Sequence, residues 1–111
     1  MSNNNLGLIA EYIVLILYKL KLYKIINHRM RNWAGEIDLI TQRGKQLVFV
    51  EVKARTSNFD TKFISHQQQR RIKNAAQVFL LSNVKYNNFD VRFDLVIVRP
   101  FQLPEIIENA W

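Results

Sequence analysis

The chain has 111 residues and no cysteine, and its 16 lysines and arginines outnumber its 9 acidic residues to give a net charge of +7. This length supports one domain with one core, and the absence of cysteine excludes disulfides, thiolate zinc sites and cysteine nucleophiles. The positive charge favours an anionic partner such as nucleic acid.

A helix is expected first, over residues 6–21, and its apolar residues nearly encircle it. Such a helix should be largely buried, and its carboxylate Glu11 then needs a charged partner, a hydrogen bond or a metal. Glu11 and Lys19 bracket only seven residues, whereas a membrane span needs about 20 apolar residues. We therefore expect a soluble cytoplasmic protein with no membrane partner.

Three segments after this helix alternate in polarity or are rich in β-branched residues, and each is expected to form a strand. They cover residues 23–31, 35–40 and 47–53. If Gly44-Lys45 is a two-residue turn with glycine first, as in type II′, Arg43 pairs with Gln46. The second and third strands then form a hairpin.

The second half of the chain predicts one helix and one strand. Residues 55–64 have no clear period and are interpreted as a mobile loop. The helix is expected over residues 66–81, with Ser65 as its N-cap and Gln68 completing a capping box. The strand is expected over residues 91–98.

The elements therefore follow the order α-β-β-β-α-β, which predicts a single α/β domain with a mixed central sheet flanked by helices. We assign the domain to residues 1–99. Residues 100–111 are interpreted as a short C-terminal tail.

Four charged side chains share one face of the predicted hairpin: Glu36, Asp38, Glu51 and Lys53. The glycine-first turn places Asp38 opposite Glu51 and Glu36 opposite Lys53, whereas a turn one residue earlier would place Glu36 opposite Glu51. Facing carboxylates repel, and Mg²⁺ would remove the conflict while keeping positions for water or phosphate oxygens. The alternative is an ordinary surface ion pair of Lys53 with Glu51 or Glu36.

The segments GEIDLI (35–40) and VFVEVKAR (48–55) resemble the core of PD-(D/E)XK nucleases, in which an aspartate, a hairpin and Glu-x-Lys follow one another. More closely, the chain resembles the bacterial YraN-like family, an uncharacterised family placed in that superfamily and often compared with Holliday-junction resolvases. The resemblance covers nearly the whole chain and implies a restriction endonuclease-like core.

The resemblance also implies roles for individual residues. Asp38 and Glu51 would be metal ligands, Lys53 would be the catalytic lysine, and Glu11 would join the site from the first helix. Glu36 would at most orient Lys53 or Arg55. The implied cofactor is Mg²⁺ or Mn²⁺, and the implied reaction is hydrolysis of phosphodiester bonds in nucleic acid, with DNA favoured.

Basic side chains could line the approach to this face and contact phosphates. Together with Gln68, the candidates for nucleic-acid binding are Arg29, Arg31, Arg55, Arg70, Arg71 and Lys73. For Arg70 and Lys73 a solvated helix face is an equal alternative. Trp33 and Phe59 are candidate stacking residues. His28 is interpreted as ordinary, and Asp94 is expected to pair with Arg92 or a helix end.

The chain departs from the family at four positions: Gln68 stands where a lysine is usual, Ala10 where a glycine before the glutamate is usual, Leu22 where a turn glycine is usual, and Arg29 where an asparagine is usual. The departures at Gln68 and Leu22 leave open a second hypothesis, a nucleic-acid-binding module that keeps the nuclease fold with weak or no cleavage. A homodimer is left open.

Overall fold

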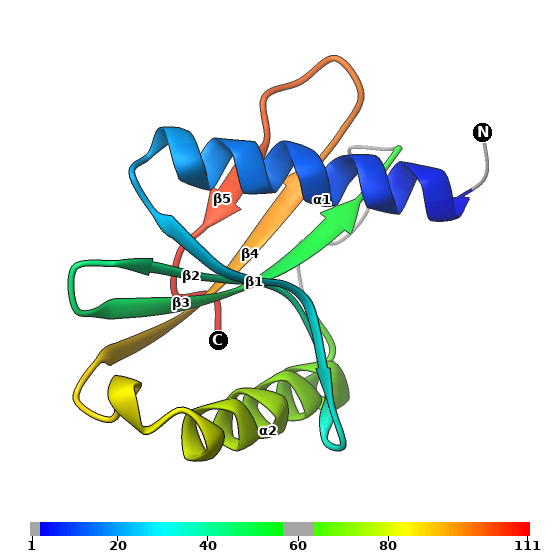
Figure 1. Ribbon diagram of the computed structural model, residues 1–111. Helices are drawn as coiled ribbons and strands as arrows, with labels where there is room; N and C mark the ends of the chain where they lie inside the picture. Colours follow the sequence, from blue (N-terminus) through cyan, green and yellow to red (C-terminus); the bar gives the residue numbers. More distant parts are fainter. Residues whose placement is uncertain (1–2, 57–63) are drawn as a thin grey trace.

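The computed structural model describes residues 3–56 and 64–111 (Figure 1). Its elements are α1 (Asn3–Leu20), β1 (Lys24–Asn32), β2 (Gly35–Arg43), β3 (Gln46–Ala54), α2 (His66–Ser82), the 3₁₀ helix η1 (Val84–Tyr86), β4 (Asp90–Val98) and β5 (Glu105–Ile107). The predicted α/β domain and its element order are confirmed. Most of the loop expected over residues 55–64, with Phe59, lies outside the described residues.

The five strands form one mixed sheet in the order β1-β2-β3-β4-β5. Strands β3 and β4 are parallel and the other neighbours are antiparallel. A parallel pair needs a long crossover, and α2 supplies it. Helix α1 covers one face of the sheet and α2 covers the other (Figure 1).

The two sheet faces carry separate cores, which explains the continuous apolar runs 47–50 in β3 and 95–98 in β4. The core beneath α2 includes Ile40, Phe49, Ile72, Phe79 and Leu95. The core beneath α1 includes Val14, Tyr18, Val48, Val50 and Val96.

Residues 100–111 are more than the predicted tail, because residues 105–107 form β5 and pair with residues 95–97 of β4. The backbone amide of Ala110 also donates to the carbonyl oxygen of Phe93 at 2.7 Å. A three-residue strand directly after Pro104 is too short for an alternating pattern to predict.

The expectation that α1 is largely buried is wrong. Ala10, Val14 and Tyr18 face the sheet and are at most 2% exposed, but Ile16 and Leu20 are 55% and 76% exposed. The sheet covers only one side of the helix, and the encircling apolar pattern does not distinguish that side from the other. None of the described helices is both long and apolar enough to cross a membrane.

Helix α1 ends in a Schellman motif, in which a residue in left-handed conformation closes the last turn. The amide of Tyr23 donates to the carbonyl of Tyr18 at 2.9 Å, and the amide of Leu22 donates to that of Lys19 at 3.0 Å. Leu22 has φ +69°, a region that favours glycine. The turn for which the resemblance implies a glycine therefore forms here with leucine.

The β2–β3 hairpin has the register predicted for a glycine-first turn. Arg43 pairs with Gln46, and Gly44 has φ +60°. Regular pairing ends at Leu39 and Val50, one residue before the two acids expected to face each other. Asp38 and Glu51 therefore lie just beyond the paired part of the hairpin, where the two strands separate. They are not a backbone-paired couple.

Candidate active site

A cleft of about 430 Å³ opens where β2 and β3 separate. Its polar lining comes from four elements: Glu11 of α1, Glu36 and Asp38 of β2, Glu51 and Lys53 of β3, and Gln68 and Arg71 of α2. The four residues expected to be catalytic thus line one cleft, together with two of the residues expected to bind nucleic acid.

The side chain of Asp38 accounts for the separation of the strands. Its Oδ2 accepts a hydrogen bond from the backbone amide of Val52 at 2.8 Å, so a carboxylate takes the donor that a neighbouring strand would otherwise pair with. Strand β3 keeps its parallel pairing with β4 through Ala54. Asp38 is therefore fixed beside Glu51 while β2 turns away.

Glu51 is the most strongly perturbed acid of the cleft. Its side chain is only 12% exposed, and burial, followed by the hydrogen bond and the charge of Asp38, raises its pKa to about 9. Gln68 Nε2 donates to Glu51 Oε2 at 3.0 Å, and Lys53 Nζ lies 3.8 Å from the same oxygen. At neutral pH the Asp38–Glu51 pair therefore retains a proton that a cation could replace.

This acid pair suits a magnesium ion. Within residues 3–56 and 64–111, no three histidine or acidic side chains gather closely enough to hold a metal by themselves. Mg²⁺, however, is commonly bound through one or two carboxylates and keeps several waters. The hard oxygens of Asp38 and Glu51 fit that coordination.

Glu11 approaches the acid pair from α1. Burial, followed by the charge of Asp38, raises the pKa of Glu11 against the opposing effects of Arg29 and His28. Its Oε1 lies 3.3 Å from His28 Nε2 and 3.6 Å from Arg29 Nε. The Glu11 and His28 atoms are both buried, and neither has a hydrogen bond of good geometry.

His28 is the residue of this region that sequence reasoning missed. It lies on β1 opposite Leu39 of β2, and its ring packs edge-on against Tyr12 of α1 with 5.2 Å between ring centroids. Periodicity within one strand cannot reveal a contact that requires β1 and α1 to meet. The interpretation of His28 as an ordinary residue is therefore corrected: its side chain is a neighbour of Glu11.

Glu36 contributes little to the interior of the cleft. It pairs with Arg31 at 2.6 Å, and the two side chains are 60% and 75% exposed. Arg31 and Glu36 are register partners across β1 and β2. Glu36 has no such partner on β3, because the β2–β3 pairing ends at Leu39. Among the described contacts Lys53 pairs with Glu51, so the cross-strand Glu36–Lys53 pair considered as an alternative does not form.

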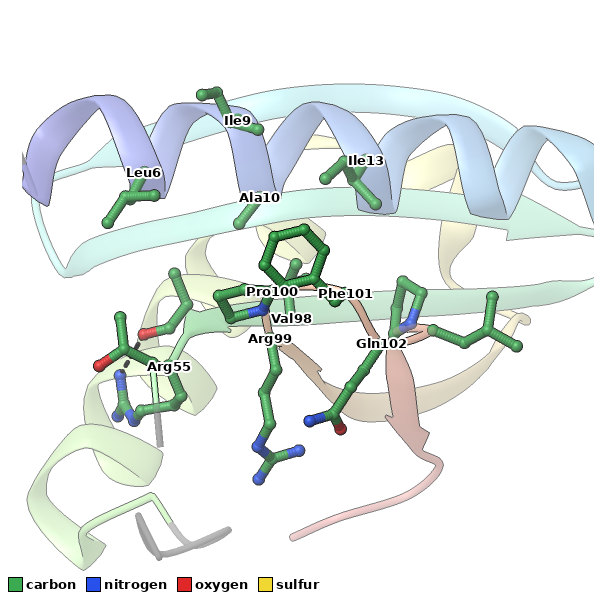
Figure 2. Close-up of a pocket in the computed structure, with 14 residues that line it drawn as sticks. Leu6, Ile9, Ala10, Ile13, Arg55, Val98, Arg99, Pro100, Phe101 and Gln102 are labelled. Carbon is green, nitrogen blue, oxygen red and sulfur yellow. Dashed lines mark hydrogen bonds between the residues drawn. The ribbon is translucent and has the colours of Figure 1, made fainter. Parts of the chain in front are cut away.

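The other candidates for nucleic-acid binding lie in three places. Arg71 and Gln68 line the cleft, and Arg70 and Lys73 are exposed on α2. Arg55 lies elsewhere, in a groove between α1 and the segment after β4 (Figure 2), with its guanidinium donating to the carbonyl of Ala54 at 3.0 Å. The structure therefore does not gather all the predicted basic residues on one surface.

Among the described contacts, only one half of the predicted capping box forms at Gln68, because its side chain bonds Glu51 and not the Ser65 amide. Ser65 Oγ accepts a hydrogen bond from the Gln68 backbone amide at 3.1 Å, which confirms Ser65 as the N-cap of α2. The Gln68 side chain extends to Glu51 in the cleft. Gln68, at a position where the resemblance implies a lysine, is thus a direct neighbour of an expected metal ligand.

Asp94 belongs to a separate buried network. It is 0% exposed and accepts hydrogen bonds from Arg92 Nε and Nη2 at 2.8 and 2.9 Å, from the Tyr18 hydroxyl at 2.8 Å and from the Asn109 amide at 3.0 Å. Burial, followed by the charge of Asp94, raises the pKa of Tyr18. The predicted Arg92 pairing is confirmed, and the network joins α1, β4 and the C-terminal segment.

Comparison with known proteins identifies the family. The sequence profile of the uncharacterised protein family UPF0102 matches residues 10–98. The chain belongs to UPF0102. A UPF0102 protein of Ehrlichia ruminantium is 40% identical over 112 residues, covering 100% of this chain and 87% of the relative. One from Mesorhizobium japonicum is 42% identical over 103 residues, covering 92% and 82%.

The family assignment confirms the resemblance to YraN-like proteins. A third UPF0102 relative, from Parvibaculum lavamentivorans, is 38% identical over 107 residues, covering 96% of this chain and 80% of the relative. The UPF0102 profile spans all the acids of the cleft, from Glu11 to Glu51. Because the family is described as uncharacterised, its name carries no activity, and function must be argued from the cleft.

Proposed function

We propose that this protein is a metal-dependent nuclease that acts in the cytoplasm and hydrolyses phosphodiester bonds of nucleic acid, with DNA the favoured substrate. The observation that carries the proposal is the placement of Asp38 and Glu51 together in one cleft, where burial and Asp38 raise the pKa of Glu51. Perturbed acids beside a lysine in a cleft are typical of catalytic sites.

Asp38 and Glu51 would hold Mg²⁺ or Mn²⁺. When bound, such an ion supplies charge neutralisation at the phosphodiester and lowers the pKa of water. Asp38 is oriented by the Val52 amide and Glu51 by the Gln68 amide. Glu11 adds a third negative charge from α1, so its role is to strengthen the attraction of the cleft for a cation.

Lys53 is the proposed stabiliser of the transition state. Its ammonium lies 3.8 Å from Glu51 Oε2 and its side chain is 24% exposed, so it can donate to a phosphate oxygen that enters the cleft. Negative charge grows on that oxygen during attack, and a preorganised donor favours the transition state over the ground state.

The Lys53→Ala variant tests this proposal. We expect cleavage of single-stranded, duplex or branched DNA with Mn²⁺ to fall by about 10²–10³-fold, as when a charge-stabilising donor is lost, while DNA binding stays nearly unchanged. The control is Lys45→Ala, at the exposed β2–β3 turn. Equal cleavage by the parent and Lys53→Ala would limit Lys53 to an ion-pair role, and binding without cleavage by every variant would favour the non-catalytic module.

The exposed face of α2 gives a separate prediction about binding. If Arg70 and Lys73 contact phosphates, their joint replacement by alanine should reduce the slope of log K against log salt by about 2, since each contact contributes about 0.9. The control removes Lys45 and Lys85, which carry the same charge and are exposed in the β2–β3 turn and in η1. Titrations at several salt concentrations measure both slopes, and an unchanged slope would mean that this face is only solvated.

A further inference from the structure

Helix α1 carries an exposed apolar stripe that the fold does not use. Ile9, Ile13, Ile16 and Leu20 are 44%, 39%, 55% and 76% exposed. Their spacing of four, three and four residues is that of a helix–helix seam. The opposite side of the same helix packs on the sheet, so this second stripe is available to another molecule.

A groove of about 1270 Å³ lies beside the N-terminal half of α1. Leu6, Ile9 and Ile13 of α1 are among its lining residues, and Figure 2 shows Phe101 on the side of the groove opposite the helix. Phe101 is fully exposed and has φ +61°, a conformation that is unfavourable for a bulky side chain. The fold thus holds an aromatic ring in solvent next to the stripe.

The stripe is symmetric about its own centre, and this symmetry indicates what covers it. In an antiparallel pairing of two α1 helices around a two-fold axis, Ile9 meets Leu20 and Ile13 meets Ile16 of the other copy. The same pairing carries the end of the second helix, with its 76% exposed Leu20 and 82% exposed Leu22, over the N-terminal half of the first. That is where the groove lies.

We propose that a second copy of this chain covers α1, pairing antiparallel along the stripe and seating its Leu20 and Leu22 in the groove. A standard interface takes about 800 Å² from each partner. The exposed stripe, together with Phe101 and Leu103, the latter 92% exposed, supplies an apolar centre for such an interface. The proposal does not depend on the proposed nuclease activity.

Equilibrium sedimentation of the full chain tests the proposal. We expect the parent to have twice its monomer mass of 13.2 kDa. Ile16→Glu should raise the dissociation constant at least 100-fold, because it places two carboxylates near the two-fold axis. The control Leu81→Glu makes a similar change on α2, at a leucine that is 76% exposed, and should leave the dimer intact. A parent that stays monomeric, including one that binds only to lipid vesicles, would overturn the proposal.

Cross-linking tests the orientation without requiring that a destabilised variant folds. The chain has no cysteine of its own, so introduced thiols react without competition. Ile9→Cys with Leu20→Cys should form disulfide-linked dimers under mild oxidation. Within one molecule the two positions are about 16 Å apart along the helix, too far to bridge. Failure of the pair to cross-link, or equally efficient cross-linking through Ile9→Cys alone, would contradict the antiparallel arrangement.

Discussion

Glu51→Gln is expected to make the cation-free protein more stable at alkaline pH than the parent, and to remove the response of its stability to divalent cations. Burial and the neighbouring Asp38 raise the pKa of Glu51 in the folded protein from 4.5 to about 9. Between these values the folded state binds more protons than the unfolded state, so the stability of the parent falls as the pH rises. Glutamine keeps the hydrogen-bonding groups without the ionisation.

Thermal unfolding across this pH range, with and without Mn²⁺, measures the effect. The parent should lose stability on the order of 3 kcal/mol between mildly acidic and mildly alkaline pH, at 1.36 kcal/mol for each unit of pKa difference. Mn²⁺ should restore this loss, because metal binding displaces the proton. The variant should lose the contribution of Glu51 to this pH dependence, and its stability should not respond to Mn²⁺. Its cleavage activity should fall at least about 100-fold, because even residues that only support metal ligands contribute 10–100-fold.

Glu36→Gln is the matched control, since Glu36 also lines the cleft but is 60% exposed and paired with Arg31. It should keep both the pH dependence and the response to Mn²⁺ of the parent. If Mn²⁺ leaves the unfolding temperature of the parent unchanged at every pH, the acid pair binds no cation and the proposed metal role of Glu51 is wrong.

The hairpin shows how far local rules carry a prediction from the sequence. Gly44 determines a two-residue turn, the turn determines the register, and the register confirmed in β2 and β3 follows from it. The sequence does not reveal where this pairing stops. Strand β3 runs on to Ala54, and only the folded structure shows that Asp38 accepts the hydrogen bond of the Val52 amide. The cleft thus opens because of a contact between residues 14 positions apart in the sequence.

Helix α1 shows a different limit. Its apolar residues predict burial, but burial in the domain and burial against another molecule require the same residue types. The sequence could therefore predict that both sides of α1 are apolar, but not that the sheet covers only the side with Val14 and Tyr18. Glu11 was correctly expected to be on a mainly apolar helix, whereas its neighbour His28 could be found only once β1 was placed beside α1.

Arg92→Met is expected to destabilise the protein by about 3–5 kcal/mol, as when one partner of a buried ion pair is removed. Asp94 is 0% exposed and would lose both guanidinium hydrogen bonds, leaving the Tyr18 hydroxyl and the Asn109 amide as its donors. Domains of this kind are commonly stable by about 5–15 kcal/mol, so the loss is a large share of the total. The midpoint and slope of urea unfolding give the change in free energy.

The matched control is Arg31→Met, which breaks the pair with Glu36, whose side chains are 75% and 60% exposed. This exposed pair should change stability by less than about 1 kcal/mol, because solvent screens it. Adding Asp94→Asn to Arg92→Met should recover part of the loss, since no unpaired charge then remains buried. If Arg92→Met unfolds at the same urea concentration as Arg31→Met, the Asp94 network does not hold α1 and the C-terminal segment to β4, and packing alone must join them.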